Sequence, residues 1–352
     1  MNNPYDSLPQ RAFWKPAVAQ RSLFDIGPIW TPKFNIQPDD KVVTFGSCFA
    51  QHIGNALLTR GYAWTSYELP PEGLSEVNRK YFNYNVFSCR TGNIYTASLL
   101  LQWVRWALEI ESAPAIAWEQ DGRFYDPFRP AIEPNGFETS DELLKSRNYT
   151  ISQFSAAIRG AEYFVFTLGL TESWKNKTHG YEYAICPGTV AGEFDENEHV
   201  FDNQPYEAIF ASLVSAMDLI RGINPNLKFI LTVSPVPLTA TNSGNHVMVA
   251  TMESKSVLRA VAGRIAALRA DSDYFPSYEI INSPTSKGTF FEPNMRSVNP
   301  YGVNFVMDNF FDCLKHSFGT PIYSQTNTPK SQTKPVEQDV VCEEELLGAF
   351  GA

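Results

Sequence analysis

The chain has 352 residues, of which 43% are hydrophobic and 19% charged, and its formal net charge is −10. This length and composition fit a globular protein of one large or two ordinary domains and exclude a disordered chain. The acidic balance, without any basic stripe, argues against nucleic acid as a partner.

The first 40 residues are rich in proline and aromatic residues, and we expect them to form an extended arm lying on the body of the protein. The chain starts without the apolar segment of a signal peptide, and no window approaches about 18 uninterrupted apolar residues. Its five cysteines are widely spaced and include no CxxC pair, which excludes a disulfide scaffold and a cysteine zinc cluster. We therefore expect a cytoplasmic protein with no membrane span.

The first half of the chain alternates apolar strands with helices. A buried strand is predicted at 42–45, and apolar spacing predicts a helix from 49 to the stop at Gly61. A second strand is expected at 62–68 and a strongly apolar helix at 96–109. The Asp121-Gly122 pair predicts the turn of a β-hairpin.

The second half repeats this rhythm. Helices are predicted at 151–161, 206–225, 254–270 and 300–318, and strands at 162–170, 227–238 and 275–281. Strands that read as continuous apolar runs are typical of a parallel sheet covered on both faces. The expected fold is thus a three-layer α/β/α sandwich with a central, mainly parallel sheet. Its domain is expected at 41–318, between the arm at 1–40 and a disordered acidic tail at 319–352 that holds a possible short helix at 343–350.

Polar residues follow three of the predicted strands, where ligands bind in such sheets. They are Gly46-Ser47-Cys48, Gly169-Leu170-Thr171-Glu172 and Ser234-Pro235. Glycine, serine and threonine are also ordinary turn and N-cap residues, so any one of these turns has a purely structural explanation. Three of them at one edge of the sheet favour a site.

The motif GSCFA at 46–50 resembles the GSCFA domain family, whose name it spells. LGLTESW, SPVP, SKSVLR, YFPSYEI and NMRSVNPYGV look like further blocks of that family, in order, and the resemblance covers about residues 35–315. The family is similar to the SGNH/GDSL hydrolases, which include esterases, lipases and carbohydrate O-acetyl hydrolases or transferases. The resemblance implies an SGNH or flavodoxin-like fold more firmly than any one reaction.

In the first block of the SGNH enzymes, a strand leads into Gly-Asp-Ser, and the serine is the nucleophile. Laid on this chain, that block places Gly46 on the glycine, Ser47 on the aspartate and Cys48 on the nucleophile. A helix N-terminus lowers the pKa of a cysteine thiol, so a thiolate nucleophile is chemically reasonable at Cys48. The alternatives are that Ser47 is the nucleophile, or that Cys48 is a small buried hydrophobic residue.

The resemblance also implies oxyanion and substrate-binding residues. The SGNH block Gly-x-Asn-Asp falls on Gly169-Leu170-Thr171-Glu172, where Thr171 keeps a hydroxyl donor and Glu172 a carboxylate. The donor glycine of the second block falls on Gly92, beside Asn93. Lys255, at a predicted helix start, either binds a phosphate or carboxylate or lies on a solvated face.

The general base of the SGNH pattern is missing. Asp-x-x-His would fall on Asn294-Met295-Arg296-Ser297, and neither Asn294 nor Ser297 can replace those side chains. His246, in the loop after the third strand of the sheet, is our predicted replacement base. His52 lies one turn below the nucleophile and is expected to be structural, and His179 and His199 stay open as alternatives.

Two functions fit these residues. One is an esterase or O-acyltransferase that acts on a carbohydrate or polysaccharide precursor through an acyl intermediate on Cys48 or Ser47. The other is a non-catalytic module that binds a glycan or partner after losing the base. The sequence contains neither a GxGxxG after a strand nor a P-loop, and we expect no cofactor and no metal.

Overall fold

The computed structural model describes residues 3–323 and 342–351. A parallel four-stranded sheet lies at its centre, in the order β1-β4-β8-β9. Its strands are β1 (Val42–Gly46), β4 (Tyr163–Leu168), β8 (Lys228–Val233) and β9 (Ser272–Tyr274). The predicted parallel sheet is confirmed, and β1, β4 and β8, the three strands that polar residues follow, are neighbours in it.

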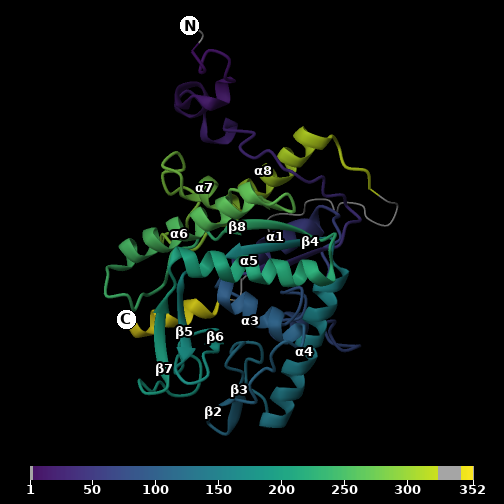
Figure 1. The fold of residues 1–352 in the computed structure, drawn as a ribbon, viewed down its shortest axis with the longest axis vertical. Coiled ribbons are helices and arrows are strands. Elements are labelled where there is room, and N and C mark those ends of the chain that lie inside the picture. Colours follow the sequence, from purple (N-terminus) through teal and green to yellow (C-terminus); the bar gives the residue numbers. More distant parts are fainter. Residues whose placement is uncertain (1–2, 324–341, 352) are drawn as a thin grey trace.

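Side chains of the sheet alternate between two hydrophobic cores. Phe164 and Phe166 of β4 belong to one core, with α3 (Ala97–Ala107), α4 (Ser140–Gly160), α5 (Tyr206–Ile223) and α6 (Val247–Leu268). Tyr163 and Val165 belong to the other, with α1 (Phe49–Thr59), α7 (Ser277–Asn282) and α8 (Pro300–Phe318). Because successive strand residues point to opposite faces, this alternation makes the α/β/α layers visible in Figure 1. The predicted fold class is confirmed.

Two smaller sheets flank the central one. The predicted hairpin is confirmed as β2 (Trp118–Gln120) and β3 (Arg123–Tyr125), and both turn residues, Asp121 and Gly122, have positive φ. The second sheet was not predicted: β5 (Glu172–Asn176) pairs antiparallel with β6 (Glu182–Tyr183) and β7 (His199–Asn203). Its strands are short and rich in polar residues, so they lack the apolar runs that mark the central strands.

Two strand predictions need correction. The segment 275–281 is not a strand, because β9 ends at Tyr274 and most of the segment forms α7. Pro276, which lies just before that helix, has no N–H for a strand ladder. The segment 62–68 forms no regular strand either, since only Trp64 makes a bridge, to Val42. The short helix α2 (Glu76–Tyr81) follows it.

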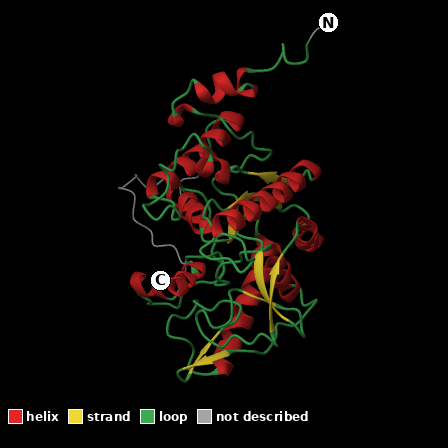
Figure 2. Ribbon diagram, turned by 90° about the vertical axis from the view of Figure 1, so that its left-hand side faces the viewer, coloured by secondary structure: helices red, strands yellow, loops and turns green. Residues whose placement is uncertain are grey.

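The N-terminal arm has two parts. Its outer part carries the short helices η1 (Gln10–Ala12), η2 (Lys15–Ala19) and η3 (Leu23–Asp25), and projects from the body in Figures 1 and 2. Its inner part is packed into the protein, where Trp30 stacks on Phe310 of α8 with ring centroids 5.2 Å apart. The division of the chain at 40 and 318 stays a prediction.

The last described segment is the 3-10 helix η4 (Glu343–Gly351), drawn in yellow in Figure 1. Residues 324–341 of the tail expected to be disordered lie outside the described residues. Leu347 of this helix lines a pocket together with Leu99 of α3 and Trp174 of β5. Within the described ranges, no helix is long and apolar enough to cross a membrane.

Candidate active site

The GSCFA turn lies at the carboxyl end of β1 and depends on Gly46. This residue has φ +124°, and a Cβ built on it would lie 2.2 Å from the carbonyl oxygen of Thr167 on β4. The backbone N–H of Ser47 then donates to that same oxygen at 2.9 Å. Only glycine fits so close to a neighbouring strand in this conformation, and the tight turn brings Ser47 and Cys48 to the edge of the sheet.

Ser47 is buried, with 3% of its surface exposed, and its hydroxyl has no hydrogen-bond partner among the described residues. Gly169, at the end of β4, packs against it, since a Cβ built on Gly169 would lie 3.1 Å from that of Ser47. A buried hydroxyl without a partner costs about 1–3 kcal/mol. Such groups are rare in folded proteins, and a substrate is one explanation for this one.

Cys48 is the N-cap residue of α1, but its side chain caps no backbone N–H. A hydrogen bond with Cys342, followed by burial, raises the pKa of the Cys48 thiol well above its ordinary value. This structure therefore does not favour the thiolate expected at Cys48. The side chain that suppresses it comes from the segment before η4.

The loop before α3 completes one wall of the site. The N–H of Ile94 donates to the carbonyl of Gly46 at 2.8 Å, which ties this loop to the end of β1. Asn93 is buried, accepts a hydrogen bond from the side chain of Gln51 on α1, and donates its own amide to the carboxylate of Glu343. The structure thus brings Asn93, and with it Gly92, to the GSCFA turn.

Lys255 of α6 lies next to Gly169, which packs against Ser47 in this turn. Its ammonium is buried and donates to the carbonyl oxygen of Gly169 at 2.5 Å. Burial lowers the pKa of Lys255 to about 8, and the nearby charge of Glu344 opposes this shift. A lysine with such a pKa exists partly as a free amine near neutral pH and can accept a proton.

The side-chain hydrogen bonds of Thr171 and Glu172 lead away from the GSCFA turn. The hydroxyl of Thr171 donates to Asn203 of β7 at 2.6 Å, and its N–H donates to Ser254. Glu172 accepts hydrogen bonds from Thr241 and from the backbone of residue 242, and burial raises its pKa. Glu172 also lines the pocket that opens beside Tyr95. Both residues hold the loops around the pocket.

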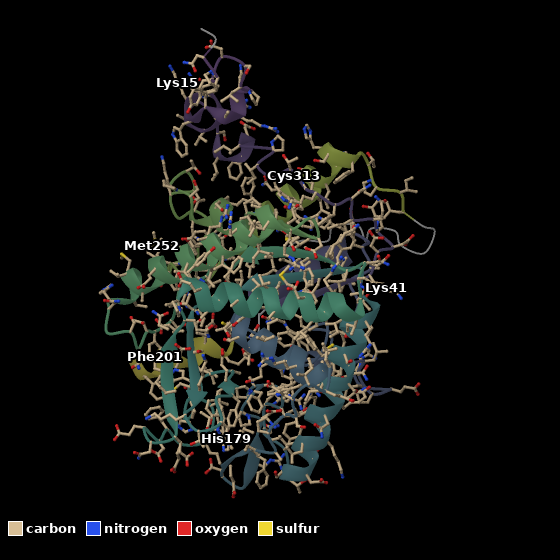
Figure 3. All side chains as sticks on the ribbon, viewed as in Figure 1. Lys15, Lys41, His179, Phe201, Met252 and Cys313 are labelled. Atoms are coloured by element: carbon tan, nitrogen blue, oxygen red, sulfur yellow. The ribbon has the colours of Figure 1, made fainter. Side chains whose placement is uncertain are left out.

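The histidines make other contacts. The ring of His246 is exposed and accepts from the N–H of Met248 at 3.2 Å, as the N-cap of α6. His52 is packed against Phe49, and burial lowers its pKa to about 4. His179 stacks on Tyr181, away from α1 in Figure 3, and His199 accepts from Asp195. In the described part of the chain, no histidine is hydrogen-bonded to Ser47 or Cys48.

Arg296 is a site residue that the sequence analysis missed. The side chain of Asn294 accepts from the N–H groups of Arg296 and Ser297, each at 2.9 Å, and folds this stretch into a turn. The guanidinium of Arg296 contributes to the electrostatics of Cys48 and pairs with Glu344 at 3.2 Å. The available signal was an arginine between Asn294 and Ser297, the two positions where the SGNH pattern has its aspartate and its histidine.

The segment Cys342–Glu345 was missed as well. Its Glu343 is buried against Asn93 and Tyr95, and Glu344 accepts from the N–H of Thr239 at 2.7 Å. The acidic run after a cysteine was the only signal in the sequence. Within residues 3–323 and 342–351, no group of three or more His, Cys, Asp or Glu side chains could hold a metal ion.

The comparison with protein families decides the relationship. The GSCFA family model matches residues 41–310, more than half of the chain. The chain belongs to the GSCFA family. The resemblance drawn from the motif blocks is thereby confirmed, and the matched region spans all four central strands, Lys255 and Arg296.

Comparison with solved structures gives a weak likeness. The crystal structure of a carbohydrate esterase family 3 from Talaromyces cellulolyticus is similar to this GSCFA protein at 13% identity and a TM-score of 0.28, over 79% of this chain and 99% of that one. At this TM-score the likeness carries no argument. No curated protein matches the chain.

Proposed function

We propose that this GSCFA protein is an SGNH-like ester hydrolase or O-acyltransferase. One observation carries the proposal: two nucleophile-type side chains, Ser47 and Cys48, share a tight turn at the carboxyl end of the central sheet, beside the buried amine of Lys255. Nucleophilic catalysis needs a hydroxyl or thiol with a proton acceptor close by. Membership of the GSCFA family, which resembles the SGNH hydrolases, supports the same reaction class.

Lys255 is the base that we propose for this reaction. As a free amine, its Nζ takes the proton of the Cys48 thiol or the Ser47 hydroxyl. The sulfur or oxygen then attacks the carbonyl carbon of the ester, and the protonated Lys255 returns the proton to the departing alcohol. Water, or the hydroxyl of an acceptor, then takes the acyl group from the enzyme. Assignment of the base to His246 stays a prediction and has a place in the test.

The oxyanion formed in this attack needs donors. Asn93 offers its side-chain amide when Glu343 is not bound to it, and the N-terminus of α1 lies at the same turn. Gly92 and Gly169 let their loops approach closely. A carbohydrate or polysaccharide as the substrate is the finer part of the proposal, and it is supported by the SGNH resemblance alone.

Turnover of p-nitrophenyl acetate by the purified protein tests the reaction. Cys48→Ala or Ser47→Ala, whichever removes the nucleophile, should reduce turnover by roughly 10³-fold or more, and Lys255→Met by roughly 10²–10⁴-fold. Mass spectrometry of the quenched reaction should find the acetyl group on the peptide that contains residues 47 and 48. The exposed His316→Ala is the control and should change nothing.

A second candidate is a binding module without catalysis. The raised pKa of the Cys48 thiol and the absence of a described histidine contact favour it. Catalysis at this site is excluded if Cys48→Ala, Ser47→Ala, Lys255→Met and His246→Ala all turn over p-nitrophenyl acetate at the same rate as the wild-type chain. The binding module then becomes the preferred function.

A further inference from the structure

We propose that Asn93, Tyr95 and Arg296 form a carboxylate-binding subsite beside Cys48, and that the chain's own segment Cys342–Glu345 occupies it. The ligand class that this subsite takes is a carboxylate-bearing molecule, such as the ester of an acidic sugar. That this ligand is a substrate rests on the proposed function, whereas the subsite itself does not.

The first observation is the set of donors around Glu343. Its carboxylate is buried, with 3% of the residue exposed, and accepts from the side-chain amide of Asn93 and from the hydroxyl of Tyr95 at 3.0 Å. The backbone N–H of Asn93 donates to it as well. A Cβ built on Gly92 would lie 3.2 Å from the same carboxylate. Convergent donors and a glycine that leaves room make a built site for a carboxylate.

The second observation is the balance of charge. Among the described residues, Arg296 forms ion pairs only with Glu344, at 3.2 Å, and with Glu345, at 3.0 Å. Glu344 is also the first of the charges that raise the pKa of Lys255. Both cations are largely buried, and a buried cation without an anion is costly. The site therefore needs a bound anion, and the segment supplies it.

The third observation is how weakly the rest of η4 is anchored. Leu346 is 45% exposed and Phe350 71% exposed, so two of the large apolar side chains of the helix are only partly covered. Leu347 and Glu344 help to line the pocket that Tyr95, Leu99 and Trp174 also form. A segment held mainly by its carboxylates can be displaced by another carboxylate, and its release opens both the pocket and Cys48.

The test measures alkylation of Cys48 by iodoacetamide in the full chain, resolved by peptide mass spectrometry. The double variant Glu343→Ala/Glu344→Ala should be alkylated at Cys48 at least 10-fold faster than the wild-type chain. Its control is Glu196→Ala/Glu198→Ala, which removes the same charge from an exposed loop and should leave the rate unchanged. Alkylation of Cys313, a residue of α8 (Figure 3) that is buried in the second core, reports any general loosening of the fold.

Added ligands then probe the subsite. The peptide acetyl-EEELLGAF-amide should slow alkylation of Cys48 in the double variant, and acetyl-QQQLLGAF-amide should not. Methyl glucuronoside at millimolar concentration should also protect, and the neutral methyl glucoside should not. Arg296→Gln, placed on the double variant, should abolish protection by both carboxylate ligands.

Two results would overturn the subsite: equal alkylation of Cys48 in the wild-type chain and the double variant, or equal protection by the charged and neutral ligands. Neither result depends on ester turnover, which the reaction test with p-nitrophenyl acetate measures separately. Protection without turnover would keep the subsite and end the esterase proposal. Turnover without protection would keep the esterase proposal and end the subsite.

Discussion

The side-chain amide of Asn93 donates a hydrogen bond to the carboxylate of Glu343, 250 residues further along the chain. One end of this bond is tied to the first strand of the sheet, through the bond from Ile94 to Gly46. The other end belongs to the segment that places Cys342 against Cys48. The bond therefore joins the GSCFA turn to a part of the chain that lies outside the matched family region.

Glu343→Ala should loosen this segment. The substitution removes the carboxylate that accepts from the amide of Asn93 and the hydroxyl of Tyr95, and the loss of such buried hydrogen bonds costs about 1–3 kcal/mol. This energy shifts the equilibrium towards the open segment. Hydrogen exchange of the backbone amides in 343–351 should therefore accelerate by roughly 5- to 150-fold. The exposed Glu198→Ala is the control. Unchanged exchange in Glu343→Ala would mean that this bond does not hold the segment.

Gly46→Ala should prevent stable folding or cost more than about 4 kcal/mol in the free energy of unfolding, because the added Cβ meets the Thr167 carbonyl at 2.2 Å. Gly73→Ala is the matched control, since Gly73 also has positive φ, +80°, but has no atom within 4 Å of the built Cβ. It should cost only the backbone strain, about 1–2 kcal/mol. Urea unfolding of both variants measures the difference. Similar losses would contradict the steric explanation.

Lys255 should make stability rise with pH in the alkaline range. Its pKa is about 8 in the folded protein, below the 10.5 of the free side chain. Between these values the unfolded chain holds the proton and the folded chain does not, so the free energy of unfolding increases as pH rises from about 8 to 10.5. The shift corresponds to about 3 kcal/mol. Denaturant unfolding from pH 7 to 10.5, compared with Lys255→Met, measures it, and parallel curves for the two proteins would refute the assignment.

Asp126→Asn should destabilise the protein by about 3–5 kcal/mol, because Arg129 and Arg147 would stay buried with less charge to balance them. Asp126 pairs with Arg129 at 2.7 Å and with Arg147 at 2.9 Å, and all three side chains are at most 1% exposed. The surface variant Asp141→Asn breaks an exposed pair with Lys145 and should cost less than about 1 kcal/mol. Thermal unfolding of both variants measures the difference. A smaller loss of stability in Asp126→Asn than in Asp141→Asn would refute the prediction.

The central strands β1, β4 and β8 could be predicted because each is an apolar run that both cores bury. The fourth strand, β9, reads SDY and has no such run. β5 and β7 could not be predicted, since ESWKN and HVFDN carry polar residues on a partly exposed sheet. The run at 275–281 was misassigned because its apolar content outweighed Pro276, which in the structure stands at a helix start. Hydrophobic pattern identifies what is buried more reliably than it identifies the element that buries it.

The site divides in the same way. Ser47, Cys48, Gly169 and Lys255 lie in or next to motif blocks, so local sequence located them. Arg296 also lies in a motif block, but the roles of Arg296 and Glu343 depend on pairing across long stretches of chain, which no period or spacing records. The expected low pKa of Cys48 was wrong for this reason: the helix N-terminus was visible in the sequence, and the opposing Cys342 was not.

Gly46 has a meaning for other members of the family. Any side chain larger than a hydrogen atom at this position would collide with the carbonyl oxygen of Thr167. A chain that keeps this turn needs the glycine in order to fold, whether or not it catalyses a reaction. The first letter of the motif therefore reports the shape of the turn, and its presence in a relative would not by itself indicate a reaction.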